Sequence, residues 1–286
     1  MTESREQLEQ ELIGIQEWEK DQKDLWFWEK LGRLPFALLD RWTPKGIQEK
    51  VGTALNEVGQ FIQTGGDYLV SETKILARLR EEAGGADGGA EWTVEQVQTL
   101  PLEVMDRTAE DLSESRTKIA TVQGAATGFG GLFTIAVDIP AMLGLSLKML
   151  QELALCYGFD PKDERERTFM VKCLQFSSSD IVGKKAVLDE LGDYDNESKQ
   201  VQVMSQLQGW REVANAYRDS FGMKKMFQLV PVAGTIFGAY SNREALQQVA
   251  ETGRMLYRKR RILQRLEAGE AQQLKAGEGQ SPTAEE

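Results

Sequence analysis

A single acid, Asp138, lies in the least charged stretch of this chain, QGAATGFGGLFTIAVDIPAMLGLSLK, residues 123–148. An acid held among apolar residues can transfer a proton or contact a cationic ligand. Asp138 also lies two positions before Pro140, which suits a helix N-cap followed by proline in the first turn. The sequence leaves both roles open and favours the helix cap, because the cap requires nothing beyond local geometry.

Residues for the common kinds of catalysis are scarce. The chain has no histidine, which removes Ser-His and Cys-His nucleophiles, HExxH zinc sites and all histidine metal ligands. Cys156 and Cys173 lie in apolar helical patterns, at a spacing typical of neither a disulfide framework nor a metal site. The segment GAATGFGG follows no predicted strand and lacks the GxGxxG phosphate-binding pattern. We therefore predict no catalytic residue, metal site or cofactor, and an enzymatic activity is disfavoured.

A strongly basic segment, RMLYRKRRILQR, lies near the end of the chain. Its cations are Arg254, Arg258, Lys259, Arg260, Arg261 and Arg265. On a helix surface they could meet anionic lipid headgroups or an acidic partner protein. The alternative is a solvated helix end, which the helix dipole favours. We predict a basic docking patch, whereas the net charge of -11 disfavours nucleic acid as a partner of the whole chain.

Glycines at close intervals recur in two apolar segments, 124–147 and 226–240. The predicted helix-packing glycines are Gly124, Gly128, Gly130, Gly131, Gly234 and Gly238. GxxxG pairs let helix backbones approach closely. We predict that the two segments form a glycine-packed hairpin, either buried in the protein or inserted in a membrane, with Asn242 as a further buried polar residue. The first segment is long enough to span a bilayer but contains an acid, and the second is too short.

Helical periodicity runs through most of the chain and predicts an all-α, multi-helix bundle. Apolar residues recur at helical spacing from Leu8 to Trp28, within 45–81 and from Thr93 to about Ala120. A helix from Asp138 should end at Gly158, where glycine can adopt the left-handed cap. A second proline-containing start follows, with Asp160 as its cap. Further helices are expected at about 163–176, 180–191, 197–218 and 243–267.

Composition divides the chain into four predicted parts. Residues 1–82 form N-terminal amphipathic helices, and 83–92, which begin with AGGADGGA at 83–90, form a glycine-rich loop. Residues 93–267 form a helical core. Residues 268–286 lack apolar periodicity and are expected to be a disordered acidic tail. The first thirty residues contain no apolar core of an export signal, so we expect a cytoplasmic chain.

Several of these motifs, in this order, resemble the signature blocks of the EcsC protein family. They are GAATGFGG, the following DIP, YGFDP and LVPVAGTIFGAYSN, preceded by EWEKDQKDLWFW and TPKGIQEKV. The likeness covers about residues 15–265. It implies a bacterial protein whose namesake is encoded beside the ATPase and membrane subunits of an ABC transporter.

We therefore expect a non-enzymatic accessory or interaction protein, peripheral to the inner face of the cell membrane. Its expected partners are an anionic membrane surface or ABC transporter subunits. The alternative is a soluble helical protein that binds an apolar small molecule or lipid in a pocket near Asp138, including an uncharacterised enzyme. The sequence predicts no oligomeric state.

Overall fold

The computed structural model describes residues 3–23, 61, 70–85, 92–129, 132–179, 181–191 and 231–278. These residues form eight α-helices and contain no strand, which confirms the predicted all-α fold. The helices are α1 (Arg5–Lys23), α5 (Glu72–Glu82), α6 (Val94–Val97), α7 (Leu102–Phe129), α8 (Leu132–Cys156), α9 (Glu164–Ser178), α10 (Ile181–Leu191) and α13 (Pro231–Glu278).

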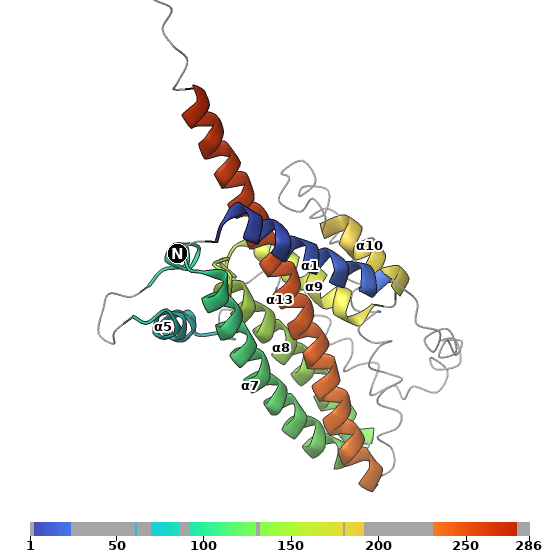
Figure 1. Cartoon of the computed structure of the whole chain (residues 1–286). Coiled ribbons are helices and arrows are strands. Elements are labelled where there is room, and N and C mark those ends of the chain that lie inside the picture. Colours follow the sequence, from blue (N-terminus) through green and yellow to red (C-terminus); the bar gives the residue numbers. More distant parts are fainter. Residues whose placement is uncertain are drawn as a thin grey trace, which may run out of the picture.

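Three long helices, α7, α8 and α13, lie side by side and form the centre of the protein (Figure 1). Helix α7 is antiparallel to α13, since Gly124 near the end of α7 meets Gly238 near the start of α13, while Asp106 and Arg258 pair at the other end. Residues 149–157 of α8 and its C-terminal turn are all buried, because α7, α13, α9 and α5 all contact α8. The hydrophobic core is centred on this helix.

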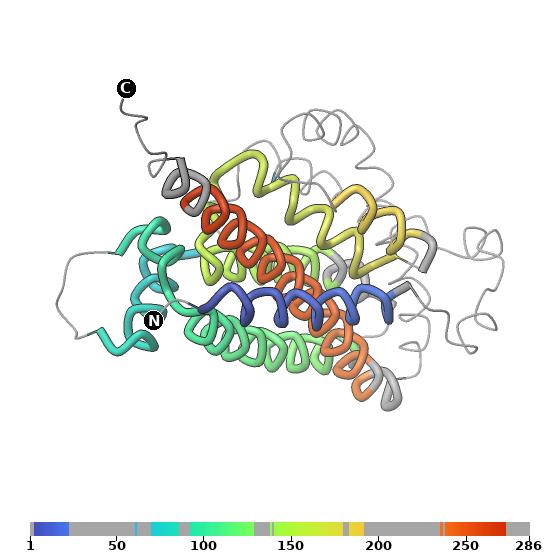
Figure 2. Tube along the Cα trace, turned by 45° about the horizontal axis from the view of Figure 1, so that its top comes forward, coloured from blue at the N-terminus to red at the C-terminus, as the bar shows by residue number. Residues whose placement is uncertain are grey.

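The remaining helices cover the central three. Helix α1 lies across α13 and also contacts α10, while α9 packs against α13 and α10 (Figure 2). The C-terminal part of α13 projects beyond the other helices, and its residues 267–272 are exposed (Figure 1). Helix α13 continues to Glu278, so the disordered tail predicted from residue 268 is wrong for 268–278.

The helix boundaries confirm some local signals and correct others. Helix α8 is followed by Gly158 with φ of +73°, as predicted. The predicted cap Asp160 accepts a bond from the Lys162 amide within a turn, and the cap of α9 is Asp163, which accepts from the Arg165 amide at 2.9 Å. The prediction that the proline after Asp160 occupies the first position of this helix is therefore wrong, because α9 begins at Glu164.

The predicted helix from Thr93 to Ala120 is two helices. A turn at 98–100 ends α6, and α7 begins after Pro101, whose carbonyl accepts bonds from the Val104 and Met105 amides. Helices α9 and α10 match the predicted 163–176 and 180–191 closely. The predicted helix 197–218 and residues 86–91 of the predicted glycine-rich loop lie outside the described residues.

Candidate functional site

Glycine allows α7 and α13 to touch through their backbones. A Cβ atom placed on Gly124 would lie 2.1 Å from the carbonyl oxygen of Gly238 and 2.9 Å from the Cβ of Asn242. No side chain fits there unless the helices separate. The predicted close packing of the two apolar segments is therefore present at Gly124 and Gly238.

The other glycines differ in their roles. Gly128 is buried one turn beyond Gly124, and Gly234 lies in the first turn of α13. Gly130 and Gly131 lie between α7 and α8, outside the described residues. Because α7 ends at Phe129 and α8 begins at Leu132, the predicted segment 124–147 is divided between two helices, and the contact with α13 involves three helices rather than a simple hairpin.

Asp138 connects these three helices through hydrogen bonds. Its side chain is fully buried, and its Oδ1 accepts from Asn242 of α13 at 2.9 Å. The same oxygen accepts from Thr127 at 3.0 Å and from Gln123 at 3.2 Å, both on α7. Since all three donors are uncharged, the network replaces the solvation of the carboxylate without an ion pair between these residues. Asp138 and Asn242 are both fully buried.

The predicted helix cap at Asp138 is wrong. Helix α8 begins at Leu132, so Asp138 and Pro140 lie in its interior. Proline has no amide hydrogen, so the carbonyl of Ala136 receives no helical bond from residue 140. The local cap signal was overridden by the partners that α7 and α13 bring to Asp138. Gln123 and Thr127 were not predicted, although each lies within the quoted glycine-rich stretch.

The end of the bundle around this network has no exposed charge among the described residues. Asp138 is the only charged residue in 119–147, and 226–242 contains none. We call the described residues of 119–147 and 231–242 the uncharged end. Large apolar side chains are nevertheless exposed there: Val122 (70%), Ile236 (73%), Tyr240 (63%) and Ile119 (46%). Among the described helices, none has an apolar stretch of the length that crossing a membrane requires.

The basic segment of α13 has a different environment from the one predicted. Arg260 is buried and forms two hydrogen bonds of 2.8 Å with the buried carboxylate of Glu166 on α9. Its guanidinium also lies 4.3 Å from the ring centroids of Phe159 and of Phe169. This two-pronged pairing with stacked rings suits arginine and holds α9 on α13.

Arg261 stabilises the C-terminal end of α8. Its guanidinium donates to the carbonyls of Tyr157 at 2.8 Å and Gly158 at 2.9 Å. Cations at helix C-termini are favoured by the unpaired carbonyls and by the helix dipole. A Cβ atom on Gly158 would lie 2.9 Å from Gln98 and 3.1 Å from Arg261, so glycine is required by space as well as by its positive φ.

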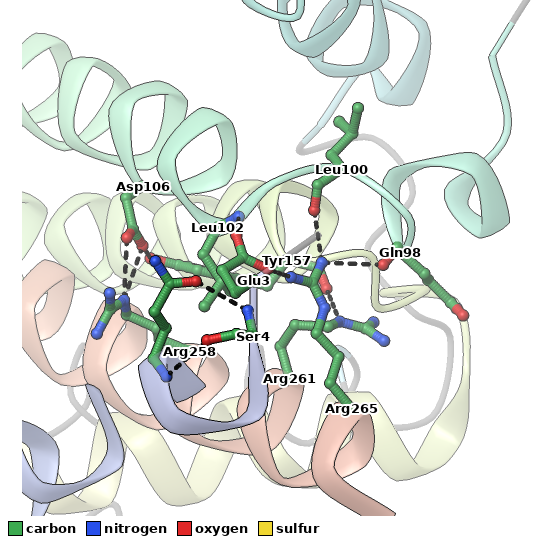
Figure 3. Close-up of polar contacts among 11 residues, drawn as sticks. Glu3, Ser4, Gln98, Leu100, Leu102, Asp106, Tyr157, Arg258, Arg261 and Arg265 are labelled. Atoms are coloured by element: carbon green, nitrogen blue, oxygen red, sulfur yellow. Dashed lines mark hydrogen bonds and ion pairs between the residues drawn. The ribbon is translucent and has the colours of Figure 1, made fainter. Parts of the chain in front are cut away.

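Arg265 connects the N-terminus of the chain to the turn between α6 and α7. It donates to the carbonyls of Gln98 and Leu100 and pairs with Glu3 (Figure 3). The second carboxylate oxygen of Glu3 accepts from the amide of Leu102, the first residue of α7. An acid at a helix N-terminus is favoured there, so Glu3 acts as a cap supplied from distant sequence.

Asp106 of α7 is shared by two helices. It accepts from the Tyr157 hydroxyl at 2.8 Å and from Arg258 at 3.0 Å (Figure 3). Arg258 also pairs with Glu11 of α1. Burial and the charge of Asp106 raise the pKa of Tyr157. Burial lowers the pKa of Arg258, but Asp106 and Glu11 outweigh burial, and the net shift is upward.

The prediction of an exposed basic docking patch is therefore wrong. Arg260 and Arg261 are buried, and the other four cations are partly buried. Lys259 pairs with Glu19 at 2.6 Å, and Arg254 lies 3.7 Å from Glu110. The cations hold helices together and cap helix ends. Sequence spacing could not reveal this, because the anionic partners lie on α1, α7 and α9.

Groups capable of reaction are few in the described part of the chain. Cys156 and Cys173 are fully buried, and burial raises the pKa of both thiols, which disfavours the nucleophilic thiolate. Within the described residues, no three acids or cysteines gather in a metal-binding arrangement.

Comparisons with known proteins agree with the resemblance of the motifs. The family model described as "EcsC protein family" matches residues 9–262. "Uncharacterized protein YdbA" of Bacillus subtilis (strain 168) is 55% identical over 273 residues, which cover 94% of this chain and 98% of that protein. "Protein EcsC" of the same organism is 32% identical over 158 residues, covering 55% of this chain and 64% of that protein. No solved structure matches. This chain therefore belongs to the EcsC protein family.

Proposed function

We propose that this protein is a non-enzymatic accessory or interaction protein that works at the inner face of the cell membrane, in association with an ABC transporter. The uncharged end would make the contact with the membrane. The transporter is implied by the family resemblance, and the surface assignment is supported by the exposed apolar side chains.

The observation that carries the proposal is where these side chains lie. The described residues expose five large apolar side chains, and all but Ile13 lie at the uncharged end. Exposed apolar residues gathered at one end of a protein, here bordered by the charged Lys118 and Arg243, typically mark a contact with lipid or with another protein. Tyr240 adds an amphipathic ring of the kind that is enriched at membrane interfaces.

The magnitude of this contact favours a role that also requires a protein partner. Burying Val122, Ile236 and Tyr240 would stabilise the bound state by about 1 to 2 kcal/mol each. Their sum, about 3 to 6 kcal/mol, corresponds to an affinity weaker than about 10 µM. Such a contact is reversible, so stable attachment would need further binding to a membrane protein.

Membrane fractionation with selective washing tests the proposal. The full chain is expressed in a bacterial host that contains the transporter, and membranes are washed with 1 M salt (about seven times physiological strength) and then with detergent. We expect retention in salt and release by detergent, because the contact is apolar. The variant V122S/I236S should reduce the membrane-bound fraction about tenfold, whereas the control I13S should not change it.

Two results would contradict the proposal. Release by salt alone would indicate an ionic contact elsewhere on the molecule. Equal membrane fractions for V122S/I236S and I13S would show that the uncharged end is not involved. A photocrosslinker at position 240 then identifies the neighbour, and the transporter link requires a crosslink to its membrane subunit.

A further inference from the structure

Helix α1 lies on the protein surface and has a narrow buried face. Leu8 and Ile15 are buried, and Trp18 packs against Phe176 of α9 with ring centroids 5.7 Å apart. Leu12 is half-buried, whereas most of the other residues of α1 are exposed. Spacings of four and three residues define an amphipathic helix lying against its neighbours α13 and α10.

Ionic contacts border this apolar face. Glu3 pairs with Arg265 at 2.5 Å, Glu11 with Arg258 at 3.0 Å and Glu19 with Lys259 at 2.6 Å. All three cations belong to α13, and all three acids belong to the N-terminal segment of residues 3–19. The segment therefore pairs with three of the cations of α13 that do not hold α8 or α9.

The surface beneath α1 remains organised without these acids. Arg258 retains its contact with Asp106 of α7, and Arg265 retains the carbonyls of Gln98 and Leu100. Lys259 differs from these two cations, because its ion pair is with Glu19 of α1 and is lost when α1 leaves. Release of α1 would thus expose an apolar strip beside Arg258 and Arg265, which stay held in place by their other contacts. The surface beneath α1 would remain folded. We call this surface of α13 and α10 the α1 seat.

We propose that the α1 seat is a binding site for an acidic amphipathic helix of a partner protein, and that α1 is the intramolecular occupant that competes with it. The chemistry of the partner follows from that of α1, whose carboxylates and leucine and isoleucine side chains match the seat. Of these pairs only that of Glu11 has an exposed carboxylate, which salt screens, while Glu3 and Glu19 are largely buried. A partner helix therefore displaces α1 by replacing these contacts with equivalent ones. This inference does not depend on the uncharged end.

A peptide-binding experiment tests the proposal in the full chain. The probe is a fluorescent peptide with the sequence of residues 1–23. The protein variant E3Q/E11Q/E19Q weakens the hold of the native α1, so we expect the peptide to bind it at least tenfold more tightly than the wild type, because the competing occupant is present less often. A peptide carrying the same three glutamines should bind more weakly than the acidic peptide. A higher salt concentration should weaken the binding of the acidic peptide.

A matched control separates this effect from net charge. The acids Glu6, Glu17 and Asp21 are exposed on the same helix, and E6Q/E17Q/D21N changes the charge equally. We expect this control to bind the peptide like the wild type. If the first triple variant loses helicity by circular dichroism, the single variant E19Q takes its place in the same titration, with E17Q as its control.

Three outcomes would overturn the proposal. The first is equal binding of the peptide to both triple variants. The second is equal binding of the acidic and the neutral peptide. In the third, vesicles of phosphatidylglycerol would bind E3Q/E11Q/E19Q while the peptide does not, which would assign the seat to anionic lipid instead of a protein helix. A positive result for the peptide is independent of membrane fractionation, because the uncharged end is unchanged in every variant.

Discussion

Substitution of Gly124 by alanine tests the contact between α7 and α13 at its tightest point. The added Cβ would lie 2.1 Å from the carbonyl oxygen of Gly238, where ordinary contacts begin at 3.4 Å. The obstacle is backbone rather than the end of a flexible side chain, so relief requires the two helices to move apart. Asn242 of α13 lies 2.9 Å from the new atom and would move with its helix, away from Asp138, to which it donates.

The expected cost follows from three effects. Overpacking in a well-packed contact costs about 1 to 3 kcal/mol. Loss of the hydrogen bond between Asn242 and buried Asp138 would add about 1 to 3 kcal/mol. Alanine favours a helix over glycine by about 1 kcal/mol, which offsets part of this. We therefore expect G124A to lower the free energy of unfolding by about 3 kcal/mol, and Tm by about 6 °C for a chain of this size.

Two other helical glycines provide controls within the same protein. A Cβ atom on Gly144 of α8 would have no neighbour within 4 Å, so G144A should raise the free energy of unfolding by about 0.5 to 1 kcal/mol. A Cβ atom on Gly253 would lie 2.7 Å from a methyl group of Leu153, which can rotate, so G253A should be intermediate. Urea denaturation followed by circular dichroism measures all three. Equal stability of G124A and G144A would refute the close backbone contact.

Three further predictions concern buried groups. D138A should lower the free energy of unfolding by about 3 kcal/mol in the same urea assay, because buried Asn242 and partly buried Gln123 and Thr127 lose their acceptor. R260M should cost about 3 to 5 kcal/mol by leaving Glu166 buried without its cation, and R260M/E166L should recover most of that loss. Because burial raises the pKa of Cys156 and Cys173, an aromatic disulfide reagent at about pH 8 should label neither thiol until the protein is unfolded.

Helix boundaries were predictable where the signal was local. Gly158 ends the C-terminal turn after α8 because its left-handed conformation requires only the glycine itself. The α9 and α10 ranges followed from apolar spacing, which repeats within a few residues. At Asp160 a local signal competed with a similar one three residues later, and the side chain of Asp163 provides the cap.

Pairings between distant residues were predictable only in part. The contact between Gly124 and Gly238 followed from two glycine-spaced apolar segments, since small residues have few other reasons to recur in that way. The role of Asp138 did not follow, because its neighbour Pro140 gave a strong cap signal and its donor Asn242 lies 104 residues away in the sequence. Spacing along one helix gives no information about such a partner.

The two parts of α13 show why a basic segment is weak grounds for a docking surface. Its N-terminal part contacts α7 through the backbone of Gly238 and carries no charge before Arg243. The large side chains of Ile236 and Tyr240 in this part are exposed. Its middle part bears the cations, but in a net acidic chain those cations find carboxylates and helix ends to pair with. The uncharged end is thus the surface more accessible to a partner. The cations become accessible only where a covering helix such as α1 can leave.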